Sequence, residues 1–192
     1  MNRISIINSL IAKNNYTNYL EIGVQGGDCF STIECKNKVG VDPDKSSAAT
    51  IHLTSDDFFE QNKSKFDVIF IDGLHHADQV IKDIDNSLKV LKKGGTIVMH
   101  DCLPNSKRMQ EIPLQEQDEW CGNVWEAFIH FRSTRNDLTM YVVDTDWGCG
   151  IIQKGSQELL VNDYPISYEN FVTHKQWWMN IISVDQFKLL YL

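Results

Sequence analysis

An almost unbroken apolar run from Phe66 to Ile71, with Asp67 as its one polar residue, constrains the fold more than any other feature of this sequence. A strand with one face in water alternates apolar and polar residues, whereas a strand covered on both faces is apolar at nearly every position. The run therefore predicts a central strand of a parallel sheet that has helices on both faces.

The flanking segments alternate between strand and helix patterns, as a doubly wound α/β sheet requires. The clearest helical periodicity lies at 80–91, where Asp83 is expected off the apolar face and Gly94-Gly95 is expected to end the helix. Further helices are expected at 3–14, 28–34 and 124–132, and further strands at 19–22, 38–42, 51–53 and 96–99.

The last third of the chain departs from this alternation. Two strand patterns at 139–143 and 150–153, joined by a short turn, predict an antiparallel hairpin at one edge of the mostly parallel sheet. The region 167–190 has a helical pattern. A length of 192 residues suits one domain, so we expect a single domain over 1–192 with a C-terminal helical extension at about 155–192.

The net charge and the cysteine content limit the binding partners and the cellular location that the sequence is compatible with. The 26 acidic and 18 basic residues give a net charge of −8, without the basic stripe that nucleic-acid-binding proteins usually show. No apolar run reaches the ~18–20 residues of a membrane span, and the first residues lack a signal-peptide core. The five cysteines form no CxxC pair, which disfavours a zinc ribbon or a disulfide framework. We expect a cytoplasmic protein that binds neither nucleic acid nor membrane.

A glycine-rich turn, E-I-G-V-Q-G-G at 21–27, stands where the first strand runs into a helix. Glycine lets a backbone approach a ligand closely, and in doubly wound sheets this turn contacts the cofactor. Asp42 ends the next strand 21 positions after Glu21, where an acidic residue can bind a ribose diol. The alternative is a glycine turn beside a surface aspartate. We favour the nucleoside site.

The glycine pattern differs from the dinucleotide fingerprint, because no glycine stands two places after Gly23. E-x-G-x-x-G-G instead resembles motif I of class I S-adenosylmethionine-dependent methyltransferases. Over roughly 18–153, the segments IDGLHHADQV, GGTIVMHD and VVDTDWGCGII resemble a bacterial group related to macrocin-type sugar O-methyltransferases. The resemblance implies a Rossmann-like fold and methyl transfer from S-adenosylmethionine to an oxygen of a small acceptor, such as a sugar or a secondary metabolite.

The resemblance also implies the residues that bind the cofactor. Ser55 and Asp56 follow the expected third strand, in a loop that lies over adenine in the resembling class; a helix N-cap is the competing interpretation for either residue. The full expected set is Glu21, Gly23, Val24, Gly26, Gly27, Asp42, Ser55, Asp56 and Asp72.

Asp72 and Asp101 each follow a strand, and those strands are expected to be neighbours about 4.8 Å apart. Two carboxylates there could share a divalent cation, and the resembling enzymes use Mg²⁺ to acidify the acceptor hydroxyl. The sequence therefore predicts Asp72, Asp101 and His100 as ligands of Mg²⁺ or Mn²⁺. The alternative leaves Asp72 only to hold the amino end of the cofactor.

Histidines close to that rim are candidates for the general base, since imidazole titrates near neutral pH. His75 and His100 both follow sheet strands, and together with Asp101 they form the expected catalytic set. His52, His130 and His174 are expected to be structural, and His76, which is adjacent to His75 and would face differently, ranks below it as a candidate base.

The polar stretch at 103–122 follows directly and is expected to be a lid over the reacting end, with Trp120 shaping the acceptor site. Asp144, Asp146 and Trp147 are expected in the edge hairpin, with Trp147 serving packing. Two other functions stay open at this point. One is a metal-dependent enzyme of the same fold with a different reaction, and the other is an inactive cofactor-binding module.

Overall fold

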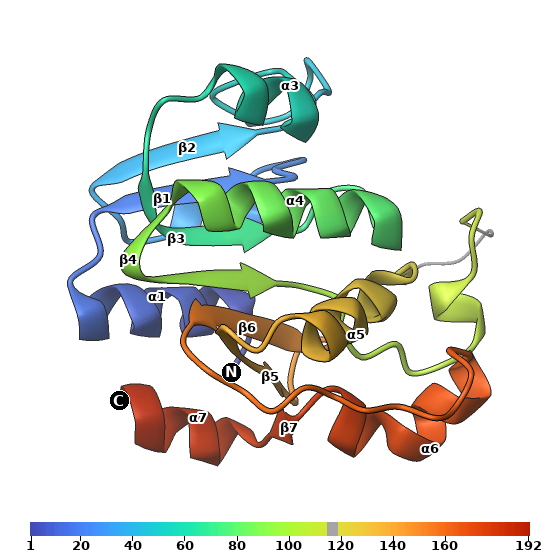
Figure 1. Ribbon diagram of the computed structural model, residues 1–192. Coiled ribbons are helices and arrows are strands. Elements are labelled where there is room, and N and C mark those ends of the chain that lie inside the picture. The colour runs from blue at the N-terminus through green and yellow to red at the C-terminus, as the bar shows by residue number, and fades with distance from the viewer. Residues whose placement is uncertain (115–118) are drawn as a thin grey trace.

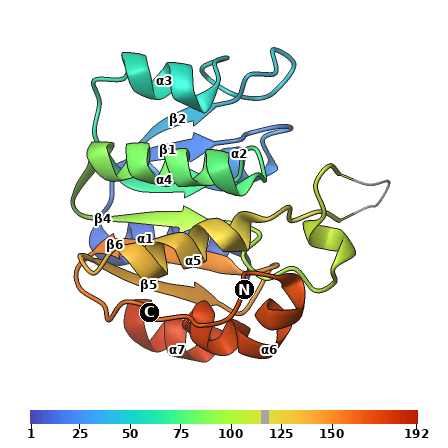
Figure 2. The ribbon, with the colours of Figure 1, turned by 45° about the vertical axis from the view of Figure 1, so that its right-hand side comes forward.

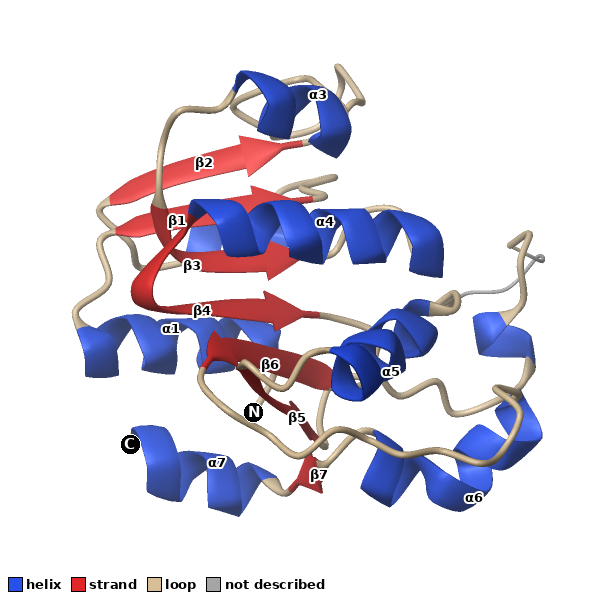
Figure 3. Ribbon diagram, viewed as in Figure 1, coloured by secondary structure: helices blue, strands red, loops and turns tan. Residues whose placement is uncertain are grey.

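The computed structural model describes residues 1–114 and 119–192. Its described residues form one seven-stranded sheet in the order β2-β1-β3-β4-β6-β5-β7 (Figure 1). The arrowheads of β1 to β4 lie at the same side of the molecule, as parallel pairing requires (Figure 3). The strands are β1 (Asn18–Ile22), β2 (Asn37–Val41), β3 (Phe66–Ile71), β4 (Leu91–Met99), β5 (Leu138–Val143), β6 (Cys149–Lys154) and β7 (Ile181–Ile182).

Helices cover both faces of the sheet. Figure 2 shows α4 and α5 on the near face and α1 behind the strands. Within the described part of the chain the α-helices are α1 (Arg3–Asn14), α2 (Asp28–Thr32), α3 (Ser55–Gln61), α4 (Ala77–Val90), α5 (Val124–Thr134), α6 (Tyr168–Trp178) and α7 (Val184–Tyr191), with a short 3₁₀ turn at Arg108–Gln110. None of the helices in those described ranges has the length and apolar character that crossing a bilayer requires.

The interior strand β3 contributes side chains to both parts of the core, one on each face of the sheet. Ile69 and Ile71 join the cluster under α4 and α5, while Val68 and Phe70 join the cluster under α1 and α7. Val68, Ile69 and Phe70 have no exposed surface. The apolar run thus has the two covered faces that its sequence predicts, and the doubly wound α/β fold is confirmed.

The late hairpin is confirmed as well, and its position is more specific than expected. β6 pairs antiparallel with both β4 and β5, so it lies between them. The two-residue strand β7 pairs with β5 and forms the outer edge. The helical stretch expected at 167–190 is therefore two helices separated by β7, with Asn180 in the left-handed region at φ 47°.

Two local expectations were wrong. The strand expected at 51–53 is a single bridge between Ile51 and Val41, because the chain turns at once into α3, whose N-cap is Thr54. The second error concerns Gly94-Gly95: α4 ends earlier, at Val90, and the two glycines lie inside β4. A Cβ at Gly95 would come within 2.7 Å of the Asp67 carbonyl oxygen, so this glycine permits the close approach of β4 to β3.

Candidate active site

Two cavities open at the carboxyl ends of β1, β3 and β4. The larger has a volume of about 900 Å³ and the smaller of about 340 Å³. They share four lining residues, namely Gly23, Gln25, Gly26 and Asp72. A ligand that extends from one cavity into the other therefore passes over the glycine-rich turn and the residue that follows β3.

The glycines of the turn have different roles. Gly23 has φ 86°, and a Cβ there would lie 2.1 Å from the carbonyl oxygen of Asp72. Gly27 has φ 83°, and its Cβ would lie 2.6 Å from Cβ of Ala48. Both glycines are required by the fold itself. A Cβ at Gly26 would meet no protein atom within 4 Å, so the space beside Gly26 is open to a ligand.

Asp42 connects the end of β2 to the glycine-rich turn. Its Oδ2 accepts hydrogen bonds from the backbone N–H groups of Val24 (3.0 Å) and Gln25 (2.9 Å). Its Oδ1 accepts one from the N–H of Asp44 at 2.9 Å. The residue lines the larger cavity, as a ribose-binding carboxylate would, and it also fixes the conformation of the turn.

The far end of the larger cavity is polar. Ser55 and Asp56 line it, but neither is the N-cap of α3, because Thr54 fills that role. Gln79 of α4 donates hydrogen bonds to Ser55 Oγ (3.2 Å) and Asp56 Oδ1 (3.1 Å). Another wall residue, Asp83, was expected off the apolar face and is instead 1% exposed.

Burial raises the pKa of Asp83 to about 6. Its Oδ1 accepts a hydrogen bond from Gln79 at 3.2 Å. Sequence reasoning missed both residues as cavity residues. The sequence position of Asp83 could have indicated its burial, because Asp83 lies next to Ile84 and three residues after Val80, and both of these residues are in the core.

Glu21 lines the smaller cavity and is buried, with 1% of its surface exposed. The hydroxyl of Tyr19 donates a hydrogen bond to its carboxylate. Burial nevertheless raises the pKa of Glu21 to about 7. The site therefore contains an acid that is poised to change protonation near neutral pH.

The smaller cavity also holds two carboxylates and two imidazoles that follow β3 and β4. His75 Nε2 lies 3.4 Å from Asp72 Oδ1, and His75 Nδ1 lies 3.3 Å from Asp101 Oδ2. His100 Nδ1 lies 3.4 Å from Asp72 Oδ1 and 3.3 Å from Asp101 Oδ1. The structure thus brings together the four residues that the sequence places at the ends of these strands.

The electrostatic interactions within this cluster favour the ionised carboxylate of Asp72 and the protonated imidazole of His75. Burial would raise the pKa of Asp72, but hydrogen bonds from His100 and His75 lower it well below the usual range. Burial would lower the pKa of His75, and contacts with Asp72 and Asp101 raise it above its usual value. The carboxylates therefore stabilise the imidazolium form of His75.

His100 has a more enclosed environment than His75. Arg3 Nη1 lies 3.0 Å from His100 Nε2, and a guanidinium can only donate, so that contact favours the neutral imidazole. Burial also opposes the charge, but Asp101, Asp146 and Asp72 together raise the pKa of His100 to about 12. Three carboxylates outweigh one guanidinium, so the net shift is upward.

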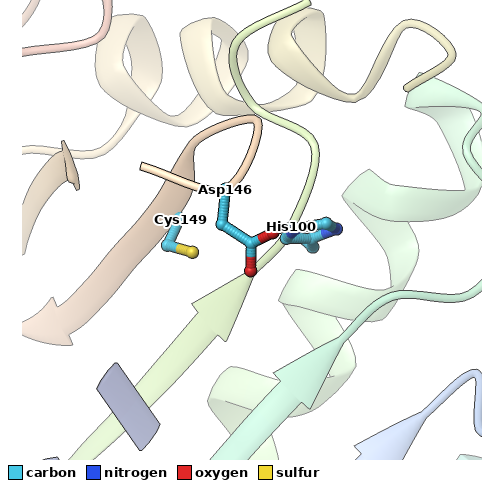
Figure 4. Close-up of side chains that lie close together, drawn as sticks. All are labelled: His100, Asp146 and Cys149. Carbon is cyan, nitrogen blue, oxygen red and sulfur yellow. Dashed lines mark ion pairs between the residues drawn. The ribbon is translucent and has the colours of Figure 1, made fainter. Parts of the chain in front are cut away.

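A second group beside the cavity consists of His100, Asp146 and Cys149, and Figure 4 shows Asp146 between the other two. Their ligand atoms lie within 4.8 Å of one another. Arg3 already supplies a cation there, since its Nη1 donates to both carboxylate oxygens of Asp146 at 3.0 and 3.1 Å. Burial raises the pKa of the Cys149 thiol, which disfavours the thiolate that metals bind.

Asp72, His75 and Asp101 form the other group that could hold a metal ion, again with ligand atoms within 4.8 Å of one another. The sequence prediction included His100 in place of His75. In the structure, His100 Nδ1 also lies beside Asp72 and Asp101, and His100 belongs in addition to the group with Asp146 and Cys149. Arg3 and Asp146 were missed as site residues, because a contact across 143 positions leaves no local pattern.

The segment expected to be a lid forms one wall of the smaller cavity through Met109 and residues 119–121. Residues 115–118 lie outside the described part. The Trp120 ring stacks on His75 with centroids 5.2 Å apart, and the Trp120 carbonyl lies 3.1 Å from His75 Nδ1. Trp147, expected to serve packing, also lines this cavity. Both tryptophans therefore face the space beside the histidines.

Comparisons with known proteins agree with this fold. Residues 20–102 match the family described as a methyltransferase domain. A methyltransferase from Podospora anserina bound to S-adenosylhomocysteine shares the fold at a TM-score of 0.62 and 14% identity, covering 80% of this chain and 78% of that one. An O-methyltransferase from Bacillus cereus in complex with the same ligand has a TM-score of 0.55 and 15% identity, with 81% and 80% covered.

A third similar structure is the O-methyltransferase TomG from Streptomyces achromogenes, in complex with S-adenosylmethionine. Its TM-score is 0.57 and its identity 16%, with 79% of each chain covered. A search of curated proteins found no match. At these identities the structural likeness establishes the fold, and the family match is confined to residues 20–102. Residues 20–102 are thus similar to a methyltransferase domain, and the chain shares its fold with O-methyltransferases whose structures contain S-adenosylmethionine or S-adenosylhomocysteine.

Proposed function

We propose that the enzyme methylates a hydroxyl oxygen of a small acceptor. The adenosine part of the cofactor would occupy the larger cavity, and its methionine tail would pass over Gly26 into the smaller one. The observation that carries the proposal is the position of His75 between Asp72 and Asp101, in the cavity that also contains the glycine-rich turn. There, a base and the residues that orient it face the reacting end of the cofactor.

When bound, S-adenosylmethionine supplies the methyl group, and the acceptor oxygen forms a bond to that carbon as the bond to sulfur breaks. The acceptor hydroxyl must lose its proton in the same reaction. His75 takes that proton, and Asp72 and Asp101 stabilise the imidazolium that results. His100 is 5% exposed and is held by Arg3 and three carboxylates, so it orients the cluster.

A divalent ion gives a second route, which the group of Asp72, His75 and Asp101 favours. Two carboxylates offer the hard oxygen ligands that Mg²⁺ and Mn²⁺ prefer, and His75 would be the third ligand. Such an ion lowers the pKa of a bound hydroxyl and orients it. His75 could not then act as the base, so the two routes exclude each other at this residue.

The acceptor is expected to be small. The smaller cavity, of about 340 Å³, must hold the methionine tail as well as the acceptor group. The tryptophans at 120 and 147 offer aromatic faces for a sugar ring or a planar metabolite, and the resemblance to macrocin-type enzymes favours a sugar. Cytoplasmic location and the absence of nucleic-acid and membrane partners stay predictions from the sequence.

The test is transfer of labelled methyl from S-adenosylmethionine to a panel of sugars, catechols and hydroxylated secondary metabolites, with S-adenosylhomocysteine measured as the co-product. Methylation at oxygen supports the proposal. Methylation confined to nitrogen or carbon acceptors would contradict it. Tight binding of S-adenosylhomocysteine without turnover on any acceptor would instead favour an inactive cofactor-binding module.

A further inference from the structure

Arg3, the first residue of α1, lies against the smaller cavity although it comes from outside the strand ends that form most of that site. Its side chain is 31% exposed. Asp146 fixes it from two directions, since this carboxylate accepts hydrogen bonds from the backbone N–H of Arg3 at 2.8 Å and from Nη1. The guanidinium is therefore held in place at the cavity wall.

Only one of the three guanidinium nitrogens is engaged. Nη1 contacts Asp146 and His100, whereas Nε and Nη2 make no hydrogen bond to any residue within 1–114 or 119–192. A guanidinium offers five N–H donors in a planar fork that matches a carboxylate. The unused side of Arg3 can therefore form a bidentate pair with an anionic group of a ligand.

The charges around the cavity point to the ligand group that needs Arg3. Arg3 is the one guanidinium or ammonium side chain among the described lining residues, which otherwise include the acidic side chains of Glu21, Asp28, Asp72, Asp101 and Glu119. The methionine tail of the cofactor carries an ammonium, which suits the acidic residues, and a carboxylate, which they would repel. A carboxylate enters this cavity at low cost only beside a fixed cation.

We propose that Arg3 binds the carboxylate of the cofactor's methionine tail, with Asp146 as the positioning residue that holds the guanidinium. This inference rests on the proposed placement of the cofactor across the two cavities. Cofactor recognition then depends on α1 as well as on the glycine-rich turn, since the helix supplies the charge that the turn lacks.

The experiment compares two ligands that differ by one group, S-adenosylhomocysteine and its decarboxylated analogue S-adenosyl-3-thiopropylamine, by calorimetry on the full chain. A charged hydrogen-bonded pair corresponds to a factor of about 10–150 in affinity. Arg3→Gln should lower the affinity for S-adenosylhomocysteine by about that factor and leave the affinity for the decarboxylated analogue nearly unchanged. The affinity of Arg3→Lys for S-adenosylhomocysteine should lie between those of the wild type and Arg3→Gln.

Lys13→Gln is the matched control, because it removes one positive charge from the exposed far end of the same helix and should change neither affinity. Asp146→Asn should lower the affinity for S-adenosylhomocysteine less than Arg3→Gln does. The double variant Arg3→Gln/Asp146→Asn should have the same affinity as Arg3→Gln alone. Equal weakening of both ligands by Arg3→Gln, or no change in either, would overturn the role of Arg3. Failure of the wild type to bind S-adenosylhomocysteine would instead overturn the proposed function.

Discussion

The carboxylate of Asp42 accepts a hydrogen bond from the backbone N–H of Gln25 at 2.9 Å, which ties the end of β2 to the turn that follows β1. Asp42 thereby has two roles, because it shapes the turn and lines the cavity assigned to adenosine. Substitution of Asp42 therefore tests both roles together.

Asp42→Ala removes both the ribose partner and the acceptor that fixes the turn. The affinity for S-adenosylhomocysteine should fall by about 10–150-fold, which corresponds to ~1.5–3 kcal/mol for a charged hydrogen bond. Asp42→Asn keeps one acceptor oxygen, so its affinity for S-adenosylhomocysteine should fall less than that of Asp42→Ala. Calorimetry measures both variants, with the surface change Asp137→Asn as the control. Wild-type affinity in a folded Asp42→Ala variant would contradict the ribose assignment.

Two glycines of the same turn should respond oppositely to alanine. Gly23→Ala puts a Cβ at φ 86° and 2.1 Å from the Asp72 carbonyl oxygen, so the free energy of unfolding should fall by at least ~1–3 kcal/mol. In Gly26→Ala the added Cβ meets no protein atom, so stability should stay nearly unchanged while the affinity for S-adenosylhomocysteine falls. Thermal unfolding and calorimetry measure the two effects. Unaltered ligand affinity in Gly26→Ala would show that the cofactor does not approach this position.

Glu21 should give stability a characteristic dependence on pH. Burial raises its pKa from 4.5 to about 7, so between these values the folded protein keeps a proton that the unfolded chain has released. The free energy of unfolding then decreases as pH rises through this window, by on the order of 3 kcal/mol. Glu21→Gln cannot titrate and should lack this decrease.

Urea unfolding of the wild type and Glu21→Gln at about pH 5 and about pH 8 isolates this effect, because all other titrating groups are common to both proteins. The variant should gain stability relative to the wild type at the higher pH. A difference between the two proteins that is the same at both pH values would show that Glu21 is ionised throughout.

Turnover should persist when divalent metal ions are removed with a chelator. The carboxylates of Asp72, Asp101 and Asp146 already face one guanidinium and two imidazoles whose pKa values are raised, so the cluster is balanced by its own cations. The measurement is initial rate with and without chelator. Loss of activity that Mg²⁺ or Mn²⁺ restores would contradict this expectation and assign Asp72, His75 and Asp101 as ligands.

Much of the fold follows from local sequence patterns. The run at 66–71 predicts a strand covered on both faces, and the parallel order of neighbouring strands predicts Asp72 and Asp101 at one rim of the sheet, as their pairing confirms. Gly95 shows the limit of such patterns, since a glycine after a helix usually marks its end. Here it is needed for the approach of one strand to another, a contact that no local pattern encodes.

The parts of the site that could not be predicted depend on tertiary contacts. Arg3 reaches Asp146 across 143 positions, and only the packing of α1 under the sheet brings them together. Asp83 was expected on the polar side of its helix because it is charged, yet α3 packs against α4, and Asp83 lies buried in the cavity wall with Ser55 and Asp56 of α3. Burial of that kind is set by neighbouring elements and not by residue type.

The most direct test of the account is the rate of methyl transfer in His75→Gln, measured beside its affinity for S-adenosylhomocysteine. If His75 is the base, the rate should fall by about 10²–10⁴-fold while the affinity changes little, because the variant removes proton acceptance and leaves the glycine-rich turn intact. The wild-type rate should also rise with pH through a pKa above the usual value for histidine. Full turnover in His75→Gln would contradict the central claim.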